Sequence, residues 1–342
     1  MPALVVVSYL ACLAMAVGVV LMLRSRLTVA RVTRLLLATV VGAAVSTGAA
    51  AMTGAESPVF LLGAAAAVLP IALLLDAACE EAAPGEQRVA WVLIALWAAV
   101  IFPTSAIVPL KLFAMCPAPE CRIEDFGGAL PLLVSSAASV LLAWRVRFAE
   151  PAEQGARFLG GVLTLWLSTA CWLASLEAAI DPYTPRILLA AIVSPVGGAA
   201  AWLLVDLLRQ SGRHPLRSAA DGVIAGLVAI IPGAATISFP WSLAVGALAG
   251  GAAALVYGSR RTASGGRAAH AALVVLTSTA IGYLAPAVSG DTIGLVFSGR
   301  IAAVVPPVAA FAAVTAFGIV ASVPAWMLRR RTTVATDDET PG

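Results

Sequence analysis

Long apolar stretches alternate with short polar segments along nearly the whole chain. The pattern predicts eleven membrane-spanning helices, each near the ~20 residues that cross ~30 Å of hydrocarbon. The predicted spans are residues 3–23, 33–53, 58–78, 89–109, 127–144, 158–178, 187–208, 218–236, 239–257, 268–288 and 301–328. We therefore expect an all-α polytopic membrane protein in which residues 1–328 form one membrane domain. Residues 329–342 form a polar tail with the composition of a disordered segment.

Composition and charge orient these spans. The chain is 61% hydrophobic and 11% charged, which is far more apolar than a soluble domain. With the N-terminus outside, 17 of the 21 Lys and Arg residues fall in inside loops or in the tail, so the N-terminus is predicted outside and the C-terminus inside. The net charge of +3 is small and scattered, which argues against a nucleic-acid partner.

The order of the spans suggests an internal repeat. The ten spans before the last divide into five plus five, and an odd number per half places the halves in opposite orientations. Residues 1–150 and 151–300, approximately, are the predicted pseudo-repeats, followed by the final helix 301–328. Inverted repeats are a common transporter plan with the solute route between the halves.

Polar residues inside two spans are candidates for a pore. Ser135 and Ser139 share one face of the fifth span, where they either line a pore or bond the carbonyls of their own helix. His270 and Thr277 lie two turns apart on one face of the tenth span. An ionisable residue in a span is a functional hypothesis by default, but His270 lies near the cytoplasmic end, where an interfacial residue is an equal reading.

Other polar groups have simpler interpretations. Asp76, Glu80 and Glu81 are predicted to lie in a solvated inside loop rather than in a metal or diphosphate site. No Walker loop and no HExxH occur, so we expect no enzyme, no cofactor and no metal. Glu177 and Asp181 either draw cations to an outer mouth or simply end a helix. The outside-loop cysteines Cys116 and Cys121 form either a disulfide or two free thiols.

Several stretches together resemble the ammonium transporter/Rh family. The similarity is clearest in "LWLSTACWLASLEAA", "AAAWLLVDLLRQ" and "AADGVIAGLVAIIPGAATISFPWSLAVGALAGG". The last stretch is rich in Gly and Pro, which on residue chemistry alone indicates ordinary close helix packing around a short turn. Weaker similarity covers "EQRVAWVLIALW", "EDFGGALPLLVSS" and "HAALVVLTSTAIGYLA". The resemblance implies an eleven-span fold in which the Gly- and Pro-rich hairpin is scaffolding.

The resemblance also implies a mechanism and a set of positions. Family proteins are homotrimers with one pore per subunit; they recruit ammonium at an outer vestibule and pass it by an aromatic gate and two pore histidines. His270 matches the second pore histidine, and Trp172 matches the second gate aromatic. Glu124 or Asp125 matches the acidic residue at the start of the fifth span.

The sequence departs from the family pattern at several pore positions. Leu132 stands where the first pore histidine is expected, and Ala65 stands at the first gate phenylalanine. The vestibule tryptophan falls near Pro109, and the vestibule serine falls at Leu176, which lies between Ser175 and Glu177. The tail also lacks an obvious helical segment for binding a PII-type regulator.

The sequence as a whole predicts a channel or transporter of the cytoplasmic (inner) membrane for ammonium or ammonia, with one retained pore histidine. His270, Trp172, Thr277, Ser135 and Ser139 are the expected solute contacts, with Leu132 beside them. Two alternatives stay open: a non-conducting sensor or assembly partner of the same fold, and a channel for another small neutral solute.

Overall fold

All regular secondary structure in the described part of the chain is helical. The structure is a computed structural model that describes residues 2–23, 28–53, 66–82, 87–114, 123–142, 155–177, 179–258, 267–290 and 294–337. For residues 2, 23, 46, 47, 49–53, 80–82, 110–114, 267–270 and 329–337 it describes the backbone only. Within these ranges the prediction of an all-α protein is confirmed.

Elements of the first half follow the predicted spans, with two π-helical turns inserted. They are α1 (Pro2–Leu23), α2 (Val29–Thr53), α4 (Val68–Ala82), α5 (Gln87–Leu96), the π-turn η1 (Trp97–Ile101), α6 (Phe102–Ala114), the π-turn η3 (Leu130–Val134) and α7 (Ser135–Val140). The fourth span is therefore α5, η1 and α6 in sequence, and the described part of the fifth is η3 and α7.

Elements of the second half are longer and more regular. They are α8 (Ala156–Ser175), α9 (Thr184–Leu208), α10 (Pro215–Ile230), the 3-10 turn η5 (Ile231–Gly233), α11 (Phe239–Tyr257), α12 (Arg267–Ser289), α13 (Leu295–Ser298), the 3-10 turn η6 (Ile301–Val304) and α14 (Val305–Asp337). Proline at the first turn of α9, α10 and α11 suits these starts, because an N–H there has no helical partner.

Eight helical segments of the described residues are long and apolar enough to cross a membrane. They correspond to the predicted spans 1, 4 and 6 to 11, and two shorter apolar helices, Val68–Cys79 and Leu130–Val140, fall within spans 3 and 5. The protein is thus a multi-pass membrane protein. The full count of eleven spans and their inside–outside orientation stay predictions.

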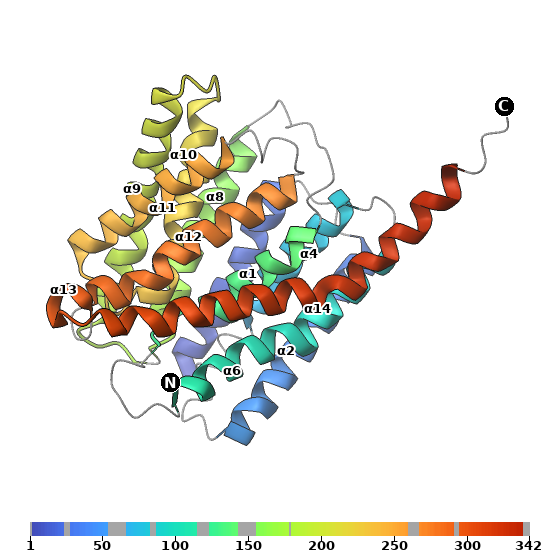
Figure 1. Ribbon diagram of the computed structural model, residues 1–342, viewed down its shortest axis with the longest axis horizontal. Coiled ribbons are helices and arrows are strands. Elements are labelled where there is room, and N and C mark those ends of the chain that lie inside the picture. The colour runs from blue at the N-terminus through green and yellow to red at the C-terminus, as the bar shows by residue number, and fades with distance from the viewer. Residues whose placement is uncertain are drawn as a thin grey trace.

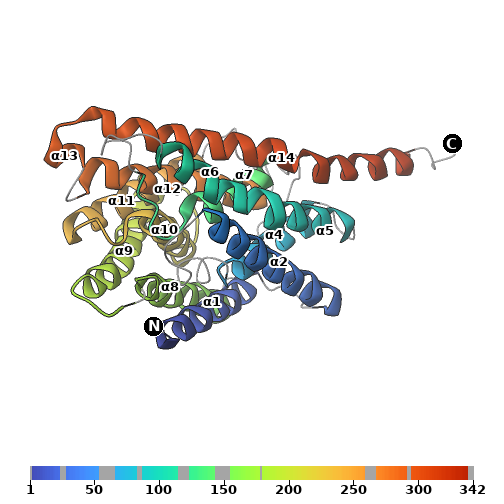
Figure 2. The ribbon, with the colours of Figure 1, turned by 90° about the horizontal axis from the view of Figure 1, so that it is seen from below.

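The two predicted halves meet along small residues. Figure 2 shows α14 along one side of the bundle and α1 with α8 along the opposite side. A Cβ added at Gly18 of α1 would lie 2.9 Å from the carbonyl oxygen of Gly161 in α8, and one at Gly161 would lie 2.8 Å from that of Gly18. Membrane helices associate where small residues let backbones approach closely, and this pair joins the first helix of each half.

A second set of small residues joins α9, α10 and α11. Each helix carries two small residues four positions apart that face its neighbours: Ser194 and Gly198, Gly222 and Gly226, and Gly246 and Gly250. The Ser194 hydroxyl donates to the Gly226 carbonyl at 2.8 Å. The close helix packing that the Gly-rich sequence indicates is therefore present as backbone-to-backbone contact between these helices.

The last helix is longer than its span. The apolar segment Ile301–Leu328 matches the predicted final span, and the helical backbone of α14 continues to Asp337. In Figure 1 the end of α14 projects beyond the other helices. Residues 329–337, for which the sequence predicts a disordered tail, continue the helical backbone of α14.

Candidate functional site

The N-terminal end of the fifth span is capped by an aspartate. The Asp125 carboxylate accepts hydrogen bonds from the backbone N–H of Ala129 at 2.5 Å and of Leu130 at 2.9 Å. These are first-turn donors that have no partner inside the helix. Glu124 is half-buried, and one of its carboxylate oxygens has no hydrogen-bond partner in the described structure. Of the two acidic candidates, Asp125 is therefore the one that organises the start of this span.

The turn between α10 and α11 holds the same segment from the other half of the chain. The N–H of Phe126 donates to the carbonyl of Pro232 at 2.9 Å, and that of Gly127 donates to the carbonyl of Ile231 at 3.2 Å. These carbonyls become available because the helix breaks at η5. A side chain at Gly127 would collide with Ile231, since an added Cβ would lie 2.4 Å from its Cγ2.

Asp125 gives the protein a testable pH dependence. Burial raises the pKa of Asp125 to about 6, although its two backbone hydrogen bonds act to lower it. Between about pH 4 and 6 the folded protein then holds a proton that the unfolded chain has released, so the free energy of unfolding falls as pH rises through this window. We expect Asp125→Asn to flatten that fall in thermal unfolding measured from pH 4 to 7. The exposed Asp181→Asn is the control, and equal slopes in all three proteins would contradict the assignment.

Leu132, at the position expected for a pore histidine, lies inside the π-turn η3. Its side chain is 3% exposed and belongs to one large apolar cluster that also contains Trp172 and, from α12, Ala272 and Leu276. Helix α12 packs directly against η3 and α7. The structure therefore packs the helix that carries His270 against the segment that carries Leu132, and Trp172 belongs to the same extended apolar core.

The serines of the fifth span are buried and already hydrogen-bonded. Ser135 donates to the carbonyl of Pro131, and Ser139 donates to that of Ser135 at 2.8 Å. Both side chains are fully buried. Their geometry is that of hydroxyls bonded to the carbonyls of their own helix, one of the two readings that the sequence leaves open.

The vestibule candidates follow directly after Trp172. The Trp172 side chain is 2% exposed, and the carbonyl of this residue accepts the Ser175 hydroxyl at 2.6 Å. Leu176 is buried, whereas Glu177 is half-buried and accepts a hydrogen bond from Thr184 at 3.1 Å. These residues therefore lie along the end of α8 with burial decreasing toward Glu177.

Two further candidates lie on α12. Thr277 is half-buried. His270 lies in the first turn of α12, where the structure describes the backbone only, so its side chain lies outside the described part. Ala65, Cys116, Cys121 and the side chains of Glu80 and Glu81 are also outside it. Pro109 lies buried within α6.

The solvated position predicted for Asp76 is wrong. The Asp76 side chain is 6% exposed and bridges two arginines of α2: Arg34 Nη1 at 2.8 Å and Arg31 Nε at 3.1 Å. The Arg34 guanidinium also lies 5.2 Å from the ring centre of Trp91. The sequence does contain a signal for this ion pair. Arg31 and Arg34 lie three residues apart at the start of a span, and arginines in that position need a negatively charged partner on a neighbouring helix.

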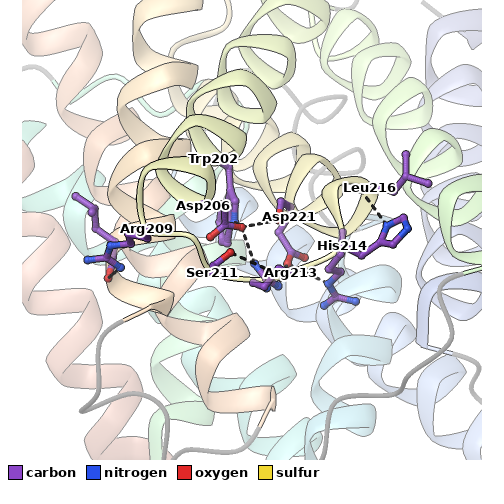
Figure 3. Close-up of polar contacts among 11 residues, drawn as sticks. Trp202, Asp206, Arg209, Ser211, Arg213, His214, Leu216 and Asp221 are labelled. Atoms are coloured by element: carbon purple, nitrogen blue, oxygen red, sulfur yellow. Dashed lines mark hydrogen bonds and ion pairs between the residues drawn. The ribbon is translucent and has the colours of Figure 1, made fainter.

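A second charged cluster ties the ends of α9, α10 and α11 together (Figure 3). Arg213 Nη2 lies 2.7 Å from Asp221 Oδ2, and its Nη1 lies 3.5 Å from Asp206 Oδ2. The Trp202 indole donates to Asp206 at 3.2 Å, and the Arg213 guanidinium lies 4.2 Å from the ring centre of Tyr257. These charges are engaged with one another and stabilise the helix ends. No group of three His, Cys, Asp or Glu side chains among the described residues is arranged to hold a metal ion.

Comparison with known proteins identifies the family. The model of the ammonium transporter family matches residues 157–337, which is more than half of the chain. The chain belongs to the ammonium transporter family. No curated protein matches the sequence significantly.

Solved structures with the same fold agree with this assignment. A point mutant of Candida albicans Mep2 has a TM-score of 0.78 at 16% identity, covering 96% of this chain and 85% of that one. Saccharomyces cerevisiae Mep2 has a TM-score of 0.73 at 15% identity, covering 94% and 86%. A protein described as a sensor Amt protein has a TM-score of 0.75 at 14% identity, covering 96% and 92%. At these identities the likeness concerns the fold.

The family match covers α8 to α14, whereas over the first half the likeness to solved structures concerns the fold. Members of the family are channels or transporters rather than enzymes. Asp125, Leu132 and the serines belong to the first half, so their roles depend on the local geometry described above.

Proposed function

We propose that this family member conducts ammonium or ammonia across a membrane along a path beside Leu132, Trp172 and α12. The observation that supports it best is the packing of α12 against η3, which carries the buried Leu132, with Trp172 in the same apolar core, in a chain whose family carries ammonium. An ion is costly in apolar surroundings, whereas neutral ammonia needs only replacement hydrogen bonds. On α12, Thr277 and His270 are the groups that supply such bonds, and a neutral imidazole can also relay a proton.

Ser135 and Ser139 have a smaller part in this proposal than the sequence suggests. Their hydroxyl donors are occupied by helix carbonyls, so they contribute to the path through the shape of the fifth span. Ser175, Leu176 and Glu177 form the outer approach, and Asp125 holds the span start with Glu124 beside it. The proposal includes eleven spans in two inverted halves of about 1–150 and 151–300 with a final helix 301–328, an inner-membrane location and a homotrimer.

The first experiment compares the two histidines of the chain. Proteoliposomes loaded with a pH dye are mixed with an ammonium salt, and internal alkalinisation is followed by stopped flow. We expect faster alkalinisation than in empty vesicles and a change of about three- to tenfold in His270→Ala, since a lost hydrogen bond to the solute has about this worth. His214→Ala is the matched control, because His214 lies exposed at the start of α10 and accepts the N–H of Leu216.

The outcomes separate the proposals. Equal rates in the parent and His270→Ala would remove His270 from the path. A parent no faster than empty vesicles would favour a non-conducting sensor, the alternative that buried Leu132 at a pore position supports. Alkalinisation by methylammonium but not ammonium salts would favour another small neutral solute.

A further inference from the structure

The fifth span is held by contacts that the sequence does not reveal. It begins with the π-turn η3 and continues as α7. A π-turn inserts one residue relative to an α-helix, so it rotates every residue after it to a different face. The rotation of α7 relative to Leu132 is therefore set by something other than regular helix geometry.

The first contact comes from the fourth span. Trp97, the first residue of η1, is fully buried, and its indole Nε1 donates to the Ser135 hydroxyl at 2.9 Å. Ser135 in turn donates to the carbonyl of Pro131. The indole is a donor only, whereas a hydroxyl both accepts and donates, so the three groups can be satisfied together in this one arrangement.

The second contact comes from α14. Trp326 is 7% exposed, and its indole Nε1 donates to the carbonyl of Ser139 at 2.8 Å. Gly318, two turns earlier on α14, lies so close that an added Cβ would be 2.8 Å from the Cβ of Ala138 and 3.0 Å from the carbonyl oxygen of Ser135. Helix α14 therefore lies directly against the face of α7 that presents the carbonyls of Ser135 and Ser139.

From these contacts we infer that Trp97 and Trp326 are positioning residues: two indole N–H groups fix the rotation of the fifth span and thereby place Leu132 beside the solute path. A rotation or slide by one residue would remove both acceptors and leave two buried donors unpaired, which is costly. Leu132 follows this arrangement, because its carbonyl accepts the hydroxyl of Ser136 at 2.5 Å. The inference rests on the proposed function, since only a solute path gives the placement of Leu132 a consequence for transport.

The test removes each indole donor while keeping an aromatic ring. The variants are Trp97→Phe and Trp326→Phe, and the matched control is Trp166→Phe. Trp166 donates its indole N–H to the carbonyl of Ala191 at 2.9 Å, which is the same kind of bond between α8 and α9. Each of the three variants loses one indole N–H and carries a phenyl ring in place of the indole. They differ in whether the lost hydrogen bond ends on the fifth span.

The first readout does not require transport. Hydrogen exchange followed by mass spectrometry reports opening of residues 130–140 in the purified full-length protein. We expect about tenfold faster exchange of this segment in Trp97→Phe and Trp326→Phe, with no change in Trp166→Phe. Equal exchange of residues 130–140 in all three variants would overturn the inference.

The second readout distinguishes positioning from loss of folded protein. Alkalinisation rates are compared for ammonium and methylammonium salts in the vesicles described above. A lower folded fraction reduces both rates equally, whereas a displaced Leu132 changes their ratio, and we expect about a threefold change in the ratio for the two variants alone. An unchanged ratio in a conducting protein would overturn the link to the path. If the parent conducts nothing, the proposed function fails, and exchange of residues 130–140 alone decides whether the indoles fix the span.

Discussion

Asp76→Asn is expected to lower the free energy of unfolding by about 3–5 kcal/mol, the usual cost of removing one partner from a buried ion pair. The loss follows from the burial of Arg34, whose side chain is 3% exposed and lies 2.8 Å from Asp76. Asparagine has nearly the shape of aspartate but no charge, so the guanidinium is left uncompensated in an apolar surrounding. Thermal unfolding of the purified protein in detergent measures the effect.

Two further variants make this result specific. Asp181→Asn removes the charge of an exposed aspartate, and we expect no measurable change in unfolding. Asp76→Leu combined with Arg34→Leu removes the fully buried pair and leaves the more exposed Arg31, so it is expected to recover part of the loss, because apolar replacement of a buried pair is often neutral. An Asp76→Asn protein as stable as the parent would show that the ion pair is not what fixes α2 against α4.

Gly246→Ala is expected to destabilise the packing of α9 against α11 by about 1–3 kcal/mol, the typical cost of overfilling a close-packed interior. An added Cβ would lie 1.9 Å from the carbonyl oxygen of Ser194, and backbone cannot move aside as a flexible side chain can. The helices would have to separate, which also weakens the neighbouring contact between Gly250 and Gly198. Thermal unfolding and the yield of monodisperse protein measure the effect.

Gly251→Ala is the matched control on the same helix. Its added Cβ would meet only the Cβ of Ala201, at 3.9 Å, which is an ordinary contact. Because alanine is the better helix former by about 1 kcal/mol, this variant is expected to be neutral or slightly more stable. Equal losses in Gly246→Ala and Gly251→Ala would attribute the effect to the helix itself instead of the contact with α9.

Hydropathy alone located most of the fold. The predicted final span 301–328 coincides with the apolar segment of the structure, and the spans from 158 to 288 each contain one long helix. Hydrophobic length is a local property, which is why the sequence predicts it well. The two π-turns in the fourth and fifth spans were not predicted, because Pro131 and its neighbours allow an ordinary α-helix as readily.

The candidate site was predicted in part. The resemblance selected Leu132 and Trp172, and the structure places both in one buried cluster with α12. The resemblance also left Glu124 and Asp125 as equal candidates. The hydrogen bonds that Asp125 accepts from Ala129 and Leu130 identify it as the residue that caps the span. The choice depends on the direction in which the turn points each side chain, which no property of the two adjacent residues reveals.

The sequence by itself determined a multi-pass helical protein of the ammonium transporter family, because apolar length and the Gly- and Pro-rich motif are written in neighbouring residues. Only the tertiary structure decided what the polar residues do. Asp76 is a buried ion-pair partner and not a loop residue, and the hydroxyls of Ser135 and Ser139 serve their own helix. The physical reason is that a polar group in an apolar interior must find a partner, and that partner is often distant in the chain, as Trp97 is from Ser135 and Trp326 is from Ser139.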